Sequence, residues 1–174
     1  MINFSKQHTL ANSYTFKGKG LHTGLSVTMT IKPAKPNTGV LFHRVDLGPD
    51  AYINAVSDYV TTTSRGTTLE KGQVKISTLE HLMATLYGMH IDNVLVEIDA
   101  PEVPILDGSA KFFADAIAAD GIVEQDAERK YLEIKENICF RDDATGSEIV
   151  ILPYDSLAVN LMIDFNSKVL GNQY

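Results

Sequence analysis

Apolar and polar residues alternate along the first part of the chain in a pattern that predicts a β-sheet. In the segment 25–33 (LSVTMTIKP) every second residue is apolar, which is the period of a strand with one buried face. The segments 14–18 and 39–45 continue this pattern, and a fourth predicted strand spans 92–100. The polar segment 57–73 between them is predicted to form strand edges around a functional loop.

Two other segments carry the period of an amphipathic helix. The first, 77–88, is predicted to end at Gly88 as its C′ residue, and the second, 111–119, to end at Gly121. The predicted buried stripes consist of Leu79, Leu82, Met83, Leu86 and Tyr87 in the first helix and Phe112, Phe113, Ala116 and Ile117 in the second. The order of strands, helix, strand and helix predicts a complete two-layer α+β domain over residues 1–127.

From about residue 131 the pattern restarts with strands alone, predicted at 131–140, 147–154 and 157–165. We therefore expect residues 128–174 to form the first strands of an incomplete second domain. Strands without helices would leave one face of their sheet bare. Either this unit associates with a second chain through its open strands, or the sequence is part of a longer protein.

The composition limits the classes of partner. The 174 residues are 44% hydrophobic and 21% charged, as in a globular protein, and the formal charge of −7 argues against a nucleic-acid or acidic-membrane partner. Neither a signal peptide nor an apolar run of about 18 residues is present, which indicates no membrane span and a cytoplasmic location. The single cysteine, Cys139, lies in an apolar run and is expected to be a buried free thiol.

Glu80 and His81 stand side by side in the first turns of the helix predicted at 77–88. Glu80 has a structural interpretation, because Ser77 and Glu80 have the spacing of a capping box. At about 100° per residue, His81 projects almost opposite the centre of the apolar stripe. A solvated surface histidine and a metal ligand are both consistent with that position.

The other histidines give no second convincing ligand. A catalytic zinc takes three protein ligands and one water, and His81 has no partner at i+3 or i+4. We expect structural roles for His8, His43 and His90, and a loop-fixing hydrogen bond for His22. The glycines at 18 and 20 do not form a phosphate loop, since the third position is Thr23 and a strand follows.

Several strings resemble the LpxC family, the zinc-dependent UDP-3-O-acyl-N-acetylglucosamine deacetylases of lipid A synthesis. The similarity runs in order across almost the whole chain, and the string from residue 76 to 110 is highly specific. The strings are 17-KGKGLHTG-24, 32-KPAKPNTGVLFHRVDL-47, 66-GTTL-69, 76-ISTLEHLMATLYGMHIDNVLVEIDAPEVPILDGSA-110 and 162-MIDFN-166.

The resemblance implies that Glu80 is the general base of amide hydrolysis and that His81 is one ligand of a Zn²⁺ ion. It also implies two similarly built α+β domains with the site between them, and an acylated UDP-N-acetylglucosamine substrate. The loop Ser64, Arg65, Gly66 and Thr67 matches family residues that line the site, where Arg65 either meets a phosphate or is solvated. Asp164 and Phe165 match residues near the nucleotide, although Phe165 also continues the apolar alternation of its predicted strand.

The chain departs from the family pattern in its second half. The remaining zinc ligands of the family come from an HxxxD segment in the second domain, and this sequence lacks that segment. The general-acid histidine and the oxyanion-stabilising threonine of the family also lie in that second domain. The chain by itself is therefore expected to be inactive. Some members of the family carry a fused FabZ-type dehydratase domain further along the chain, and these 174 residues neither confirm nor exclude such a domain. A non-catalytic module that binds a nucleotide sugar or a protein is the alternative hypothesis.

Overall fold

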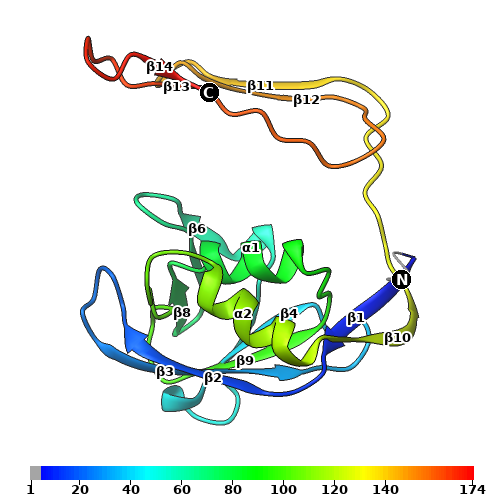
Figure 1. The fold of residues 1–174 in the computed structure, drawn as a ribbon. Coiled ribbons are helices and arrows are strands. Elements are labelled where there is room, and N and C mark those ends of the chain that lie inside the picture. The colour runs from blue at the N-terminus through cyan, green and yellow to red at the C-terminus, as the bar shows by residue number, and fades with distance from the viewer. Residues whose placement is uncertain (1–4) are drawn as a thin grey trace. The chain divides into compact units, whose positions relative to one another are not determined.

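The computed structural model describes residues 5–174, so the first four residues of the predicted first domain lie outside it. The chain forms two compact units, one ending at Arg129 and the other running from Lys130 to Tyr174 (Figure 1). Helices and several sheets occur together, which confirms the mixed α+β class. Within the described residues, no helix is both long and apolar enough to cross a membrane.

A five-stranded sheet forms the base of the first unit. Strand β4 runs parallel to β9, and all other neighbours in this sheet are antiparallel. The four strands predicted from alternation are all present, with ends shifted by one or two residues. In spatial order the strands are β2 (Tyr14–Lys19), β3 (Ser26–Pro33), β9 (Val94–Ile98), β4 (Val40–Arg44) and β5 (Tyr52–Asn54).

One face of this sheet carries the core, and the other face is polar. Met29 on β3 lies opposite Ile98 on β9 in the strand register, and both are fully buried. Their polar neighbours point the other way, where Lys32 on β3 forms an ion pair with Glu97 on β9 at 2.6 Å. This alternation is what an antiparallel sheet covered on one side requires.

Helices α1 (Glu80–Gly88) and α2 (Lys111–Asp120) cover the apolar face of the sheet (Figure 1). Phe113 on α2 is buried and packs edge-on against Phe16 of β2, with ring centroids 4.8 Å apart. The predicted stripes were too wide, because Tyr87 and Phe112 are 65% and 54% exposed. A helix covered on one side buries only a narrow stripe, and positions at its edge turn toward solvent.

The predicted end of the first helix was also wrong. Gly88 lies inside α1, and Met89 is its C-cap residue. The left-handed conformation expected of Gly88 is found instead at His90, with φ of 60°. Gly121, with φ of 83°, ends α2 as predicted.

Two smaller sheets complete the first unit. The β7–β8 hairpin pairs Thr68 with Ser77, so the loop that precedes β7 lies beside the segment that enters α1. The other small sheet pairs β1, near the start of the unit, with β10, near its end. The remaining elements are β6 (Val60–Thr62), β7 (Thr68–Lys71) and β8 (Val74–Ser77) in one sheet, β1 (Lys6–Leu10) and β10 (Ile122–Glu128) in the other, and the short helices η1 (Val45–Leu47) and η2 (Ser57–Tyr59).

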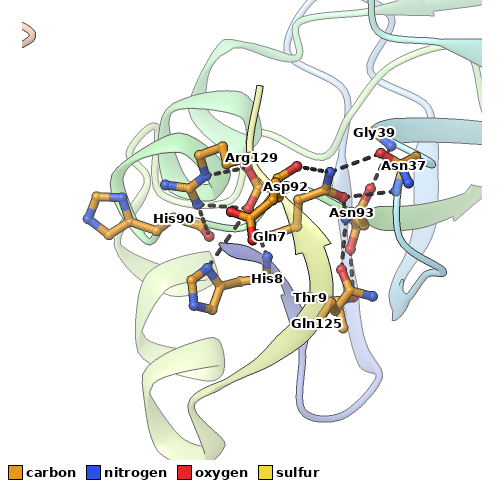
Figure 2. A network of polar contacts seen from close by, with 11 residues as sticks. Gln7, His8, Thr9, Asn37, Gly39, His90, Asp92, Asn93, Gln125 and Arg129 are labelled. Atoms are coloured by element: carbon orange, nitrogen blue, oxygen red, sulfur yellow. Dashed lines mark hydrogen bonds and ion pairs between the residues drawn. The ribbon is translucent and has the colours of Figure 1, made fainter. Parts of the chain in front are cut away.

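A buried amide ties the β1–β10 sheet to the rest of the unit (Figure 2). Asn93 is 1% exposed, and its side-chain nitrogen donates to Gln7 Oε1 at 2.8 Å and to Gln125 Oε1 at 2.7 Å. Its side-chain oxygen accepts from the Gly39 amide at 2.9 Å. Every polar group of the Asn93 side chain has a partner, so the burial of this amide does not carry the cost of an unpaired polar group.

Asp92 fixes the last residue of the first unit, and its loss is expected to destabilise the fold. The Arg129 guanidinium donates to both Asp92 oxygens at 2.8 and 2.7 Å, and the His8 amide donates to Oδ2 at 2.8 Å (Figure 2). We expect Asp92→Ala to lower the free energy of unfolding by about 2–3 kcal/mol, because charged hydrogen bonds in a partly buried setting are lost. Urea denaturation followed by circular dichroism measures this change.

The ion pair of Asp115 with Lys111 provides the matched control, since both side chains are more than half exposed. Asp115→Ala is expected to change the free energy of unfolding by less than about 0.5 kcal/mol. Equal effects of the two variants would contradict the role given to Asp92.

The second unit contains two separate hairpins. The prediction of a strand at 157–165 was wrong for most of that segment, because only Ile163 and Asp164 pair with another strand. The apolar side chains of this segment are exposed, with Val159 at 79%. They form no packed face, so packing does not stabilise the segment as a strand. Cys139, expected to be buried, is exposed. The strands are β11 (Ile138–Asp142), β12 (Ser147–Ile151), β13 (Ile163–Asp164) and β14 (Asn172–Gln173).

Candidate active site

Glu80 is the first residue of α1 and does not take part in a capping box. The helix begins after Leu79, which makes no side-chain cap bond. Ser77 ends β8 instead, and its hydroxyl donates to the Pro101 carbonyl at 3.2 Å. The capping interpretation of Glu80 was therefore wrong, because the strand pairing extends to Ser77 and delays the start of the helix.

The Glu80 carboxylate points to the loop before β7. Its Oε1 accepts a hydrogen bond from the Thr67 amide, and the Thr78 amide donates to the Thr67 carbonyl at 3.1 Å. Loss of solvent around the carboxylate raises the pKa of Glu80. The opposite effect is larger, because hydrogen bonds from Thr67 and from the Glu80 amide, and the nearby His81, all lower this pKa. The pKa of Glu80 consequently lies below its ordinary value, which favours the ionised carboxylate at neutral pH.

His81 follows Glu80 and is half-buried, whereas Leu82, Thr85 and Leu86 on the same helix are buried. Its carbonyl accepts from the Thr85 hydroxyl at 2.8 Å, a local bond within the helix. The helix thus keeps part of the His81 side chain accessible beside the Glu80 carboxylate.

The loop of Ser64, Arg65, Gly66 and Thr67 lies against Glu80. A Cβ atom added to Gly66 would stand 3.8 Å from Glu80 Oε1, and Gly66 has φ of 155°. Arg65 and Thr78 are non-glycine residues in the left-handed region, with φ of 60° and 57°. Such conformations cost free energy in non-glycine residues and are enriched at ligand and active sites.

His22 reaches this loop from the turn between β2 and β3. Its Nε2 donates to the Arg65 carbonyl at 3.2 Å, and because a carbonyl only accepts, Nε2 carries the proton. The loop-fixing hydrogen bond expected of His22 is confirmed. His43, for comparison, stacks on Tyr52 with centroids 4.1 Å apart, which is a structural contact.

Glu102 was missed by the sequence analysis. It is fully buried, and its carboxylate accepts from the His22 amide, from the Thr23 amide and hydroxyl, and from the Thr78 hydroxyl. Burial alone would raise the pKa of Glu102. The hydrogen bonds have the larger combined effect and lower this pKa to about 2. No local pattern singles out Glu102, because Glu97 also has apolar neighbours in the sequence and yet lies on the polar face of the sheet.

Acid is expected to destabilise the fold through Glu102. Its pKa falls from 4.5 to about 2 on folding, so the carboxylate contributes stability above pH 4.5 and loses it as the pH falls toward 2. A shift of this size corresponds to a contribution on the order of 3 kcal/mol. Urea denaturation at several pH values between 6 and about 2.5 measures it, and Glu102→Gln should flatten the dependence. The same slope in both proteins would contradict the assignment.

Asp164 and Phe165 belong to the second unit. Asp164 lies on β13, where its Oδ1 accepts from the Asn166 amide at 2.9 Å, and Phe165 is 42% exposed directly after this strand. The structure brings together Glu80, His81 and the loop 64–67 within the first unit alone.

The described residues do not form a complete zinc site. Among residues 5–174, no group of three or more histidine, cysteine, aspartate or glutamate side chains is arranged to hold a metal ion. His81 supplies one imidazole, and a catalytic zinc needs three protein ligands. The donor set on the described residues therefore does not fit a catalytic zinc without further ligands.

Comparison with known proteins decides the family. The sequence model of the LpxC family, described as UDP-3-O-acyl N-acetylglycosamine deacetylase, matches residues 7–174. The chain belongs to the LpxC family. A relative named bifunctional enzyme LpxC/FabZ from Bacteroides thetaiotaomicron is 46% identical over 169 residues. A UDP-3-O-acyl-N-acetylglucosamine deacetylase from Geobacter sp. (strain M21) is 43% identical over 168 residues.

The LpxC relatives are longer than this chain. Each of these two matches covers 97% of the chain, but only 37% of the Bacteroides relative and 54% of the Geobacter relative. The chain thus spans between about a third and about half of the length of the LpxC relatives that it matches.

Proposed function

We propose that this chain is the N-terminal part of a zinc-dependent UDP-3-O-acyl-N-acetylglucosamine deacetylase, with Glu80 as general base and His81 as one zinc ligand. The observation that carries the proposal is the Glu80 carboxylate, held by the Thr67 amide at the start of α1 beside the half-buried His81. Membership of the LpxC family supports the reaction class.

In this proposal Glu80 takes the proton from a water molecule that attacks the carbonyl carbon of the acetamide. At neutral pH the Glu80 carboxylate is ionised and is therefore able to accept a proton. The amide of Thr67 holds Oε1 of this carboxylate in place. A zinc ion, when bound, activates water and polarises a carbonyl oxygen.

The same proposal assigns the remaining site residues. The loop of Ser64, Arg65, Gly66 and Thr67 faces the substrate, and Asp164 and Phe165 contact the nucleotide, where a ring stacks on uracil. We also propose that residues 1–127 and 128–174 belong to two α+β domains of the same build. The greater length of the relatives and the exposed apolar side chains on the second unit's hairpins are consistent with this division.

The test is acetate release from the acylated UDP-N-acetylglucosamine, measured for this chain and for a full-length form that spans the length of the deacetylase relatives. We expect metal-dependent turnover by the full-length form and none by the 174-residue chain. Robust turnover by the short chain would contradict the proposed division of the site. No turnover by a folded full-length form, together with calorimetric binding of UDP, would favour a non-catalytic nucleotide-sugar module.

Zinc content gives an independent check. One imidazole is a third of the protein ligands that a catalytic zinc takes, so elemental analysis of the purified 174-residue chain is expected to find well under one zinc per molecule. The full-length form is expected to hold about one, as a single site requires. Stoichiometric zinc in the short chain would show that other groups complete the site.

A further inference from the structure

Glu102 lies at the junction between β8 and the segment that leads to α2. The Ser77 amide donates to the Pro101 carbonyl at 2.9 Å, and the Val103 amide donates to the Ser77 carbonyl at 3.1 Å. These two bonds hold Glu102 beside the end of β8, directly before the residues that enter α1. Its backbone position is thus set by the same strand that positions Glu80.

The Glu102 carboxylate joins two segments that are far apart in the sequence. From the turn after β2 it accepts from the His22 amide at 3.0 Å, the Thr23 amide at 2.8 Å and the Thr23 hydroxyl at 2.7 Å. From the other side it accepts from the Thr78 hydroxyl at 2.9 Å. A carboxylate has about four lone-pair sites, so these donors leave it little capacity for a substrate or a water molecule.

Both segments in turn contact the loop that serves Glu80. His22 Nε2 donates to the Arg65 carbonyl at 3.2 Å, and the Thr78 amide donates to the Thr67 carbonyl at 3.1 Å. The Thr67 amide then donates to the Glu80 carboxylate. The contacts form a closed ring in which Glu102 is the one carboxylate that holds both sides together.

The space around Glu102 is reserved for its carboxylate. A Cβ atom added to Gly20 would overlap Glu102 Oε2 and the Thr23 hydroxyl, and would lie 2.9 Å from Glu102 Cδ. Gly20 does not have a positive φ, so close approach and not backbone conformation is the reason for glycine here. The packing at residue 20 therefore complements the carboxylate of Glu102.

We propose that Glu102 is a positioning residue of the deacetylase site, which holds Thr78 and His22 so that the loop 64–67 presents the Thr67 amide to Glu80. The inference rests on the proposed function, because it assigns Glu102 to the site that Glu80 and His81 form. Glu102 acts through these residues and does not touch the substrate. Without it, Thr78 loses the bond that holds a left-handed conformation two residues before Glu80.

The experiment compares Glu102→Gln with the wild type in the full-length form. The amide of glutamine has the same size but turns an NH₂ group toward donors, so we expect kcat to fall about 10- to 100-fold, as for other residues that orient a site's ligands. KM should change much less. The nuclear magnetic resonance signals of the Thr67 amide and the His22 ring should shift, which a purely structural role elsewhere would not cause.

A gentler pair of variants guards against unfolding of Glu102→Gln. Thr78→Ala removes one donor to Glu102, whereas Thr78→Ser keeps the hydroxyl, so the first should shift the Thr67 amide signal and the second should restore it. Glu97→Gln is the matched control, because Glu97 pairs with Lys32 on the polar face of the sheet. It should leave kcat and both signals unchanged.

The outcomes separate this inference from the proposed function. An active wild type in which Glu102→Gln and Thr78→Ala leave kcat and the Thr67 signal unchanged would overturn the inference and leave the function standing. A wild type without deacetylase activity would overturn the function. In that case the Thr67 and His22 signals decide whether Glu102 positions the loop, and unchanged signals would overturn the inference as well.

Discussion

Glu80→Gln in a full-length form is expected to lower kcat by about 10²- to 10⁴-fold, the usual contribution of a general base. The glutamine amide cannot accept the proton of the attacking water. Its oxygen can still accept from the Thr67 amide, the bond that Glu80 Oε1 receives in the structure. The melting temperature and the zinc content should therefore stay close to those of the wild type.

The measurement is steady-state acetate release, combined with thermal unfolding and elemental analysis of the same preparations. Glu97→Gln removes a carboxylate charge on the polar face of the sheet and should keep activity within about two-fold. A loss of only two- or three-fold in Glu80→Gln would argue against the general-base assignment. A large loss accompanied by lost zinc would assign Glu80 to metal binding instead.

Phe113→Ala is expected to cost about 3–5 kcal/mol of the free energy of unfolding. Phe113 is 1% exposed and connects α2 to the sheet through its edge-on contact with Phe16, at an interplanar angle of 74°. Truncation leaves a cavity between these layers and removes an aromatic pair. The effect is large relative to the total stability of a domain of this size.

The neighbouring residue supplies the control on the same helix. Phe112 is 54% exposed, so Phe112→Ala should change the free energy of unfolding by less than about 0.5 kcal/mol. Urea denaturation of both variants measures the difference. Similar losses would mean that α2 is not packed on the sheet through Phe113.

Much of the fold of the first unit could be predicted because alternation and helical period report which face of each element is buried. The strands β2, β3, β4 and β9 and both helices follow directly from these patterns. The widths of the buried stripes did not follow, since Phe112 and Phe113 are chemically alike and only the packing of α2 separates them.

The site was harder to predict because it depends on contacts between distant segments. The sequence and its resemblance to the LpxC family singled out Glu80 and His81, but the capping interpretation of Glu80 failed because strand pairing extends to Ser77. Glu102 lies about 80 residues from His22 in the sequence. Local patterns carry no information on such a pairing, and only the folded chain brings its donors to one carboxylate.

The pairing of β1 with β10 has a consequence for the order of folding during synthesis. Lys6 and Asp126, which meet across this sheet, are separated by 120 residues. At about 5–20 residues per second, β10 is made roughly 6–24 s after β1. During that interval β1 lacks the strand with which it pairs in the folded unit, and Asn93, once it is made, has no contact with Gln125. The first unit is therefore expected to close in a late step, when the ribosome has delivered β10.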